Sequence, residues 1–248
     1  MEQILLVTGG SRGIGAATAL LAAANGCAVA VNYVGREDAA RDVVQRIAAA
    51  GGRAIAVQGD VANEADVLRM FAEVDARLGR LTGLVNNAGV VDVSARLEDM
   101  SLARFRRMFD INVIGTMLCA REAVRRMGRR HGGSGGAIVN VSSAASRLGS
   151  PGQYVDYAAA KGAVDAFTVG LAKEVAADGI RVNAVRPGLI DTEIHAAGGL
   201  PDRVRDLAHQ VPMGRGGTAD EVAQAIVWLL SPQASYTTMS MLEVSGGR

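Results

Sequence analysis

Short apolar, β-branched runs alternate along the chain with longer segments in which apolar residues recur at helical spacing. Continuous apolar runs are typical of strands buried on both faces, and the longer periodic segments are typical of helices that cover such strands. Strands are expected near 3–8, 28–33, 54–58, 82–86, 137–142, 181–186 and 240–244. Helices are expected near 13–25, 36–50, 64–78, 101–130, 153–178 and 218–230. The alternation predicts an α/β protein whose parallel sheet carries helices on both faces.

Helix and loop boundaries support this order. Asn63, followed by acidic residues in the first helical turn, is a typical helix start. The glycine-rich stretch 131–137 is too short for a domain linker and predicts a turn. No Pro- or Ser-rich linker or internal repeat divides the chain, so one domain over 1–248 is expected. The irregular segment 189–216 follows a strand and should lie over the carboxyl edge of the sheet, either as a substrate lid or as a surface loop.

Charge and composition narrow the classes of function. Lysine and arginine number 26 against 25 acidic residues, so we expect neither nucleic acid nor an anionic membrane as partner. Cys27 and Cys119 lack ligand spacing and the three histidines are scattered, which predicts no disulfide and no metal site. No segment has the length of a membrane span, and we expect a cytoplasmic protein. One basic cluster is interpreted as the solvated end of a helix: Arg125, Arg126, Arg129 and Arg130.

The first predicted strand leads into a glycine-rich turn, TGGSRGIG at 8–15. Glycines permit a tight turn and let the N-terminus of the following helix approach a pyrophosphate. The second strand ends at Asn32 and Tyr33, where NAD-binding enzymes place an acid that holds the ribose 2′-hydroxyl. Arg12 and Arg36 instead offer positive charge to a 2′-phosphate. The sequence therefore predicts NADP(H) over NAD(H), with ordinary surface arginines as the alternative.

Tyr157 and Lys161 lie four residues apart in a predicted helix, so their side chains share one face. A nearby fixed cation favours the phenolate and should lower the tyrosine pKa from its usual value of about 10. The same spacing is also common on a solvated helix face. Two serines upstream, Ser142 and Ser143, together with the glycine-rich turn, favour a catalytic pair.

Several motifs then occur in a fixed order: TGGSRGIG, GDV at 59–61, NNAG at 86–89, Asn112, Ser143, YAAAK at 157–161 and RPG at 186–188. This ordered set resembles the short-chain dehydrogenase/reductase family, in its simple single-domain subgroup, over essentially the whole chain. The resemblance implies a three-layer Rossmann fold with seven parallel strands in the order 3-2-1-4-5-6-7. It also implies the catalytic residues Asn112, Ser143, Tyr157 and Lys161.

The resemblance assigns roles within this set. Asn112 would bend its helix and free a backbone carbonyl toward a water that leads to Lys161. Ser143 matches the family position, whereas Ser142 is expected to be a core-facing hydroxyl bonded to backbone. Tyr154 is an alternative acid, but only Tyr157 has a lysine four residues on.

The resemblance also implies a cofactor site. Asp60 and Val61 would hold the adenine ring, and residues 86–89 would line the adenosine ribose. Pro187, Gly188 and their neighbours would pack against the nicotinamide. The expected cofactor contacts are Gly9, Ser11, Arg12, Gly13, Ile14, Gly15, Asn32, Tyr33, Arg36, Asp60, Val61, Asn86, Asn87, Ala88, Gly89, Tyr157, Lys161, Pro187, Gly188, Ile190 and Thr192.

The implied reaction is hydride transfer between NADP(H) and a carbonyl or secondary alcohol. Tyr157 would donate a proton to the developing alkoxide, Ser143 would fix the same oxygen, and Lys161 would lower the tyrosine pKa and hold the nicotinamide ribose. Three substrates stay open: a 3-oxoacyl thioester on a carrier protein, a sugar such as glucose, or a small carbonyl compound. A protein that only senses the cofactor is the alternative from another class.

The expected substrate pocket, 144–156 and 189–215, contains few charged residues. Arg147, Glu193 and His195 are the polar exceptions, which favours a compact polar or neutral substrate. Relatives usually have glycine where this chain has Met239, so the local turn there is in doubt. The two long helices are expected to pair between subunits and give a homotetramer or homodimer.

Overall fold

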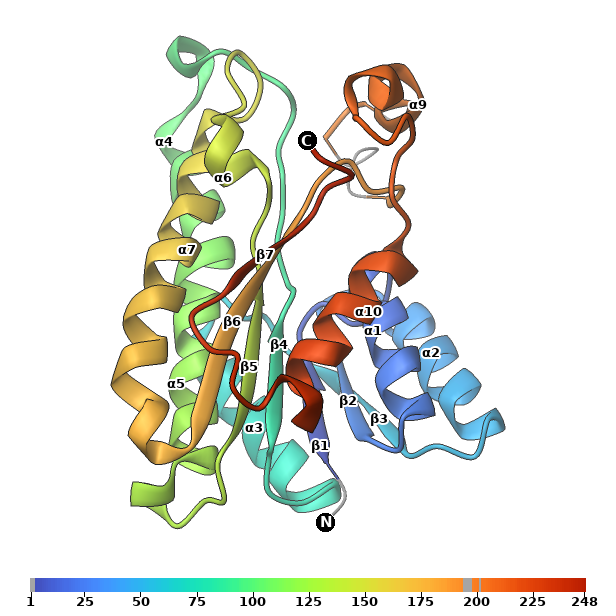
Figure 1. Cartoon of the computed structure of the whole chain (residues 1–248), viewed down its shortest axis with the longest axis vertical. Coiled ribbons are helices and arrows are strands. Elements are labelled where there is room, and N and C mark those ends of the chain that lie inside the picture. Colours follow the sequence, from blue (N-terminus) through green and yellow to red (C-terminus); the bar gives the residue numbers. More distant parts are fainter. Residues whose placement is uncertain (1–2, 194–197, 201) are drawn as a thin grey trace.

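Seven parallel strands form one sheet in a computed structural model that describes residues 3–193, 198–200 and 202–248. The strand order is β3-β2-β1-β4-β5-β6-β7, and every neighbouring pair is parallel (Figure 1). Order and positions confirm the predicted sheet. The strands are β1 Ile4–Val7, β2 Ala28–Tyr33, β3 Ala54–Gln58, β4 Gly83–Asn86, β5 Gly136–Val141, β6 Ile180–Pro187 and β7 Met241–Val244.

Helices cover both faces of the sheet and make three layers (Figure 1). One face carries α1 Gly13–Ala24, α2 Glu37–Ala49 and α10 Ala219–Leu230; the other carries α3 Glu64–Arg77, α4 Leu102–Phe109, α5 Gly115–Met127 and α7 Val155–Val175. Successive strand residues point to opposite faces. Leu6 of β1 accordingly joins the core with α3, α5 and α7, while Leu5 and Val7 join the core with α1, α2 and α10.

The predicted helix 101–130 is not continuous. A π-helical turn, η2 Asp110–Ile114, separates α4 from α5. The Asn112 side chain explains the break, because its Nδ2 donates to the Met108 carbonyl at 2.9 Å, the acceptor four residues back that an α-helical N–H would use. The expected bend at Asn112 is therefore present.

Short elements complete the chain. The described part of the 189–216 segment includes the helix α9 Arg203–Leu207, and its Ile190 forms a β-bridge with Gly217. In Figure 1, α9 and the C-terminus lie at the same end of the molecule. His195 lies outside the described residues. The remaining helices are α6 Ala145–Leu148 and the 3-10 turns η1 Leu97–Asp99, η3 Arg129–His131, η4 Ala176–Asp178, η5 Ala208–Gln210 and η6 Pro232–Ala234.

The basic cluster near the end of α5 is solvated at Arg125, Arg129 and Arg130, as expected, whereas Arg126 is partly buried. The Arg126 guanidinium pairs with Asp75 at 2.7 Å and with Glu122 at 2.9 Å, and it lies 5.0 Å from the centroid of the Phe71 ring. Arg130 pairs with Asp178. These arginines tie α5 to neighbouring elements, so their charge is largely matched within the protein.

Met239 has a φ of +66°, in the left-handed region that favours glycine. Its N–H donates to the Val182 carbonyl at 2.7 Å, which fixes this backbone conformation where the chain enters β7. The conformation gives a physical reason for a glycine at this position in relatives. The methionine is accommodated with its side chain half exposed.

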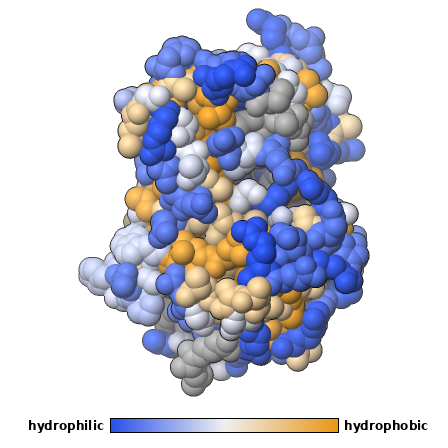
Figure 2. Space-filling model, turned by 90° about the vertical axis from the view of Figure 1, so that its right-hand side faces the viewer, coloured by the Kyte–Doolittle hydropathy of each residue, from blue (hydrophilic) through white to orange (hydrophobic). Residues whose placement is uncertain are grey.

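No helix within the described ranges is long and apolar enough to cross a membrane, and no three potential metal-binding side chains gather there. Cys27 and Cys119 are both buried, as expected. Figure 2 shows one face of the molecule, where hydrophilic side chains predominate around an apolar patch near the middle.

Candidate active site

Glycines shape the turn between β1 and α1. Gly9 and Gly13 have φ values of +60° and +51°, which L side chains rarely adopt. A Cβ on Gly15 would lie 2.4 Å from the Gly9 carbonyl oxygen, so only glycine lets α1 begin this close to the strand. The turn thus directs the N-terminus of α1 toward a neighbouring cavity, an arrangement suited to a phosphate.

The side chains of Asn32 and Asn87 hold this turn through hydrogen bonds. Asn32 is 1 % exposed; its Oδ1 accepts the Gly9 N–H at 3.0 Å, and its Nδ2 donates to the Gly59 carbonyl at 2.9 Å. Asn87 donates to the carbonyls of Thr8 and Gly9 at 2.9 and 3.0 Å. The side-chain amide of Asn32 is therefore engaged in holding the loop, whereas the sequence led us to expect it at the ribose.

The turn borders a cavity of about 400 Å³, which we call the dinucleotide cavity. It brings together most of the predicted cofactor contacts from the ends of β1, β2, β3 and β4. Its lining includes Gly9, Ser11, Arg12, Gly13, Ile14, Asn32, Tyr33, Arg36, Asp60, Val61, Asn87, Ala88, Gly89 and Thr192. The carboxyl ends of parallel strands are the usual place for a nucleotide in this architecture.

Arg12 and Arg36 converge on a single anion in this cavity. Each guanidinium lies 3.0 Å from the same oxygen, Oε2 of Glu193. A hydrogen bond from Arg12 holds the pKa of Glu193 below its usual value, with the charges of both arginines adding to the effect. The two arginines thus form a ready site for a negatively charged oxygen, and the Glu193 carboxylate stands in for such a group.

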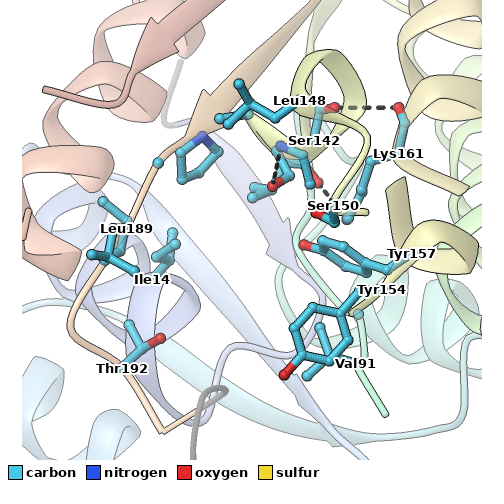
Figure 3. A pocket seen from close by; sticks show the side chains of 18 of the residues that line it. Ile14, Val91, Ser142, Leu148, Ser150, Tyr154, Tyr157, Lys161, Leu189 and Thr192 are labelled. Carbon is cyan, nitrogen blue, oxygen red and sulfur yellow. Dashed lines mark hydrogen bonds between the residues drawn. The ribbon is translucent and has the colours of Figure 1, made fainter. Parts of the chain in front are cut away.

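A second cavity of about 180 Å³ adjoins the first, and we call it the reaction cavity. It collects Ser143, Tyr157 and Lys161, together with the predicted nicotinamide contacts Pro187, Gly188, Ile190 and Thr192. Figure 3 shows the rings of Tyr154 and Tyr157 on one side, facing Ile14, Leu189 and Thr192 across the space. Residues far apart in sequence therefore surround one reaction volume.

Tyr157 and Lys161 lie on one face of α7, as predicted. The Lys161 ammonium is buried, donates to the Val141 carbonyl at 2.7 Å and lies 5.6 Å from the centroid of the Tyr157 ring. Burial lowers the pKa of Lys161 to about 8, partly opposed by the charge of Asp165. The ammonium is therefore mostly charged at neutral pH.

The expected lowering of the tyrosine pKa does not occur in this structure. The surrounding protein raises the pKa of Tyr157 to about 12, because burial outweighs the hydrogen bond with Ser143 that lowers it. Although Tyr157 borders the cavity and is partly accessible, its hydroxyl lies among protein atoms that disfavour a phenolate. At neutral pH Tyr157 is thus a protonated phenol.

The two serines and the second tyrosine separate as expected. The Ser143 hydroxyl oxygen accepts the Ala145 N–H at 3.1 Å, and Ser143 also bonds to Tyr157. Ser142 is buried and donates to the Lys161 carbonyl at 3.3 Å. Tyr154 donates to the Gly198 carbonyl at 3.3 Å, so its hydroxyl holds the 189–216 segment.

Asn112 does not border either cavity; it supports the wall behind Lys161. Its Oδ1 accepts the Val90 N–H at 3.2 Å and its Nδ2 donates to the Val90 carbonyl at 3.1 Å. A Cβ on Gly89 would lie 2.7 Å from Asn112 Oδ1, which explains the glycine there. The Asn112 carbonyl, expected to face a water, accepts the Thr116 hydroxyl at 3.0 Å.

Two other predicted cofactor contacts are also structural. Asn86 is buried in β4 and donates to Asn140 Oδ1 at 2.9 Å, so it joins strands instead of lining the ribose. Gly15 acts through the close approach of α1 described above. Neither residue lines either cavity, since Asn86 is buried between strands and Gly15 has no side chain.

The charged lining of the reaction cavity differs from the sequence prediction. Arg203 and Arg248 border it, whereas Arg147 does not, and Glu193 borders the dinucleotide cavity instead. Sequence analysis missed both arginines because Arg203 lies among other charges of an irregular segment and Arg248 is the final residue. Leu148 and Val91, also unpredicted, add apolar surface.

Comparison with known proteins extends this picture. A family model described as enoyl-(acyl carrier protein) reductase matches residues 9–248. The chain is 57 % identical over 245 residues to YgfF, an uncharacterised oxidoreductase of Escherichia coli (strain K12), covering 99 % of each protein. It is 41 % identical to the cis-4-hydroxycyclohexanecarboxylate dehydrogenase of Sinomonas cyclohexanicum, with 99 % of this chain and 96 % of that protein covered.

Two further matches agree. A 3-oxoacyl-[acyl-carrier-protein] reductase of Synechocystis sp. (strain PCC 6803) is 40 % identical, with 99 % and 96 % of the two chains covered. The crystal structure of a dehydrogenase/reductase from Sinorhizobium meliloti 1021 superimposes with a TM-score of 0.91 at 34 % identity, covering 99 % of this chain and 94 % of that one. Sequence, sheet order and site geometry together place the chain in the short-chain dehydrogenase/reductase family, as an oxidoreductase.

Proposed function

We propose that the protein is an NADP(H)-dependent oxidoreductase that transfers a hydride between the nicotinamide and a carbonyl or secondary alcohol. The observation that carries the proposal is the meeting of Ser143, Tyr157 and Lys161 in a cavity that adjoins the glycine-lined dinucleotide cavity. Bound NADP(H) supplies or accepts the hydride. The proposed unit is one domain over 1–248, with 189–216 as the substrate lid.

Side chains of the protein transfer the proton and position the substrate oxygen. In the reductive direction the Tyr157 phenol donates its proton to the substrate oxygen, and its high pKa keeps that proton in place at neutral pH. The Ser143 hydroxyl, already bonded to Tyr157, fixes the same oxygen. The Lys161 ammonium favours the phenolate that remains and lies where it can hold a ribose hydroxyl. Asn112 positions the wall behind Lys161.

The preference for NADP(H) over NAD(H) rests on the two arginines that share Glu193. A 2′-phosphate carries more charge than a carboxylate and accepts hydrogen bonds from both guanidiniums. Neither Asn32 nor Tyr33, at the end of β2, offers a carboxylate to a free ribose 2′-hydroxyl. Titrating NADPH and NADH separately tests this: a Kd for NADH equal to or below that for NADPH would contradict it.

The substrate is proposed as a compact carbonyl compound or its alcohol, with a 3-oxoacyl thioester as the second candidate. The reaction cavity is small and bounded by Leu148, Val91 and two tyrosines, which suits a compact molecule. The thioester finds support in the carrier-protein reductase among the relatives.

Oxidation of NADPH measured with 4-oxocyclohexanecarboxylate, acetoacetyl thioester and an aldehyde, beside NADP⁺ with glucose, separates these classes. Turnover of the thioester alone would select the second candidate. Absence of turnover with every substrate would favour a cofactor-sensing protein.

We also propose a cytoplasmic homo-oligomer, a homotetramer or homodimer, that pairs through the layer of α4, α5 and α7. Apolar side chains on this layer remain partly exposed in a single chain: Phe109, Ile114 and Met117 are 37 %, 44 % and 36 % exposed. Burying such side chains against a second copy would remove apolar area from water. A monomeric mass in light scattering would contradict the proposal.

A further inference from the structure

Arg203 lies at the wall of the reaction cavity in a fixed orientation. It begins α9, its Nη2 donates to Gln153 Oε1 at 2.8 Å, and its guanidinium lies 5.3 Å from the centroid of the Tyr154 ring. Stacking on an aromatic face and a side-chain hydrogen bond both restrict a guanidinium before any ligand binds. The bond to Gln153 uses one of its five N–H donors.

The positive charge of Arg203 has no carboxylate to balance it. Among the described residues, no Asp or Glu oxygen lies within 4.0 Å of Arg203 or Arg248, and residues 194–197 and 201 include neither amino acid. Arg205, two residues along α9, provides the contrast, since it pairs with Asp202 at 2.9 Å. Within the described part of the chain, Arg80 and Arg181 also lack a carboxylate partner, but their guanidiniums donate to several backbone carbonyls, whereas Arg203 and Arg248 line the reaction cavity.

Arg248 adds a second guanidinium to the same wall, and its main-chain carboxyl oxygen accepts a hydrogen bond from Arg147 at 2.9 Å. Both guanidinium-bearing residues line the reaction cavity and an adjoining hollow of about 240 Å³. Burial lowers the pKa of Arg203, and the neighbouring charge of Arg248 lowers it further, against an opposing effect of Tyr154. An anion that binds between or beside two partly desolvated positive charges stabilises both of them.

We propose that Arg203, assisted by Arg248, binds a carboxylate of the substrate, so that the enzyme acts on a compact oxo- or hydroxycarboxylic acid. The substrate class rests on the proposed function; the carboxylate site does not. A guanidinium binds a carboxylate through two parallel hydrogen bonds, which fixes the orientation of the ligand as well as its position. This replaces the expectation of a polar or neutral substrate.

The position of the site limits the length of the acid. Tyr154, which carries Arg203, is the N-cap residue of α7 and precedes Tyr157 by three residues, so the carboxylate and the reacting oxygen lie along one helix start. A cavity of about 150 Å³ holds a benzene ring; the reaction cavity measures about 180 Å³, and the adjoining hollow at the two arginines measures about 240 Å³. A single ring that carries the oxygen and the carboxylate at opposite positions is therefore the probe that we choose for this site.

Isothermal titration calorimetry of cyclohexanecarboxylate against cyclohexanecarboxamide, with and without NADP⁺, tests the site independently of turnover. We expect the acid to bind about tenfold or more tightly than the amide, as for a hydrogen-bonded charge. Arg203→Gln should remove that difference, Arg248→Gln should reduce it, and the matched control Arg205→Gln should retain it. Thermal unfolding of each variant establishes that it is folded.

Three results would each overturn the carboxylate site. One is equal affinity for acid and amide, and another is no binding of the acid at 10 mM, a limit of roughly a few kcal/mol of binding free energy. The third is a folded Arg203→Gln protein whose preference for the acid is unchanged. Turnover of 4-oxocyclohexanecarboxylate is then measured separately. Binding that depends on Arg203 without NADPH oxidation would uphold the site and reject the proposed reaction, whereas reduction of the methyl ester of this ketone by NADPH at equal kcat/KM would uphold the reaction and reject the site.

Discussion

Replacing Glu193 with glutamine should tighten the binding of NADPH while leaving that of NADH nearly unchanged. Glu193 occupies the point on which Arg12 and Arg36 converge, 3.0 Å from each. A 2′-phosphate that binds both arginines must first displace this carboxylate. The glutamine side chain keeps the shape but removes the charge, so the displacement becomes easier only for the cofactor that carries the phosphate.

The magnitude follows from the exposure of the two pairs. The side chains are 47 % exposed for Arg12, 53 % for Arg36 and 57 % for Glu193, so each pair belongs to the surface class worth about 0.2–1 kcal/mol. Losing both should favour NADPH by about 1 kcal/mol, or roughly fivefold in Kd. Because salt screens exposed charges, the gain should shrink when ionic strength rises from about 0.05 to 0.5 M.

Fluorescence titration of NADPH and NADH against both proteins measures the effect. Glu98→Gln is the matched control, because Glu98 also forms an exposed surface pair, with Arg96, and lines neither cavity. A Kd for NADPH that stays constant or rises in Glu193→Gln would refute the reasoning. So would an equal tightening for NADH, since NADH has no group to compete with the carboxylate.

Three further predictions address chemistry and stability. Tyr157→Phe should lower kcat by a factor of about 10² or more, the usual contribution of a positioned acid, while the Kd for NADPH from titration stays within about twofold. In a pH series, kcat/KM for reduction should fall as pH rises through about 8. Lys161 loses its charge there, while Tyr157, with a pKa of about 12, keeps its proton. A flat profile to pH 10 would contradict this assignment. Met239→Gly should raise the free energy of unfolding by about 0.5–1 kcal/mol in denaturant titrations, because it relieves a φ of +66°, whereas Ser240→Gly, at an ordinary φ, should lower it by a similar amount.

The fold was predictable because its signals are local. Strands buried on both faces appear as apolar runs, and turn residues bound them closely enough that each expected strand is found. The helix start at Asn63 is a clear case: its side chain accepts the N–H groups of Ala65 and Asp66 at 2.9 and 3.2 Å. Such caps depend only on neighbouring residues, so the sequence reveals them.

Features that depend on distant partners were predicted less well. Asn32 stands where a cofactor contact is expected, but its amide is engaged with Gly9 and Gly59 across a loop. The tyrosine pKa also depends on burial, which outweighs the hydrogen bond with Ser143 in this structure. Arg203 becomes part of the reaction cavity only through Gln153 and Tyr154, some 50 residues earlier in the chain.

The start of α7 connects Arg203 with Tyr157, although the two residues lie far apart in the sequence. Tyr154 carries Arg203 on its ring and bonds Gly198 through its hydroxyl, and the same helix presents Tyr157 one turn later. A substrate anchored at Arg203 is therefore positioned by the helix that also presents the proton donor, without an intervening flexible segment. Catalysis by orientation requires reacting atoms within about 3–3.5 Å of each other. A support shared by the anion-binding residue and the proton donor is an effective way to hold the substrate at that distance. The 189–216 segment thus has a structural reason to lie against α7: it brings the charge that selects the substrate to the residue that reacts with it.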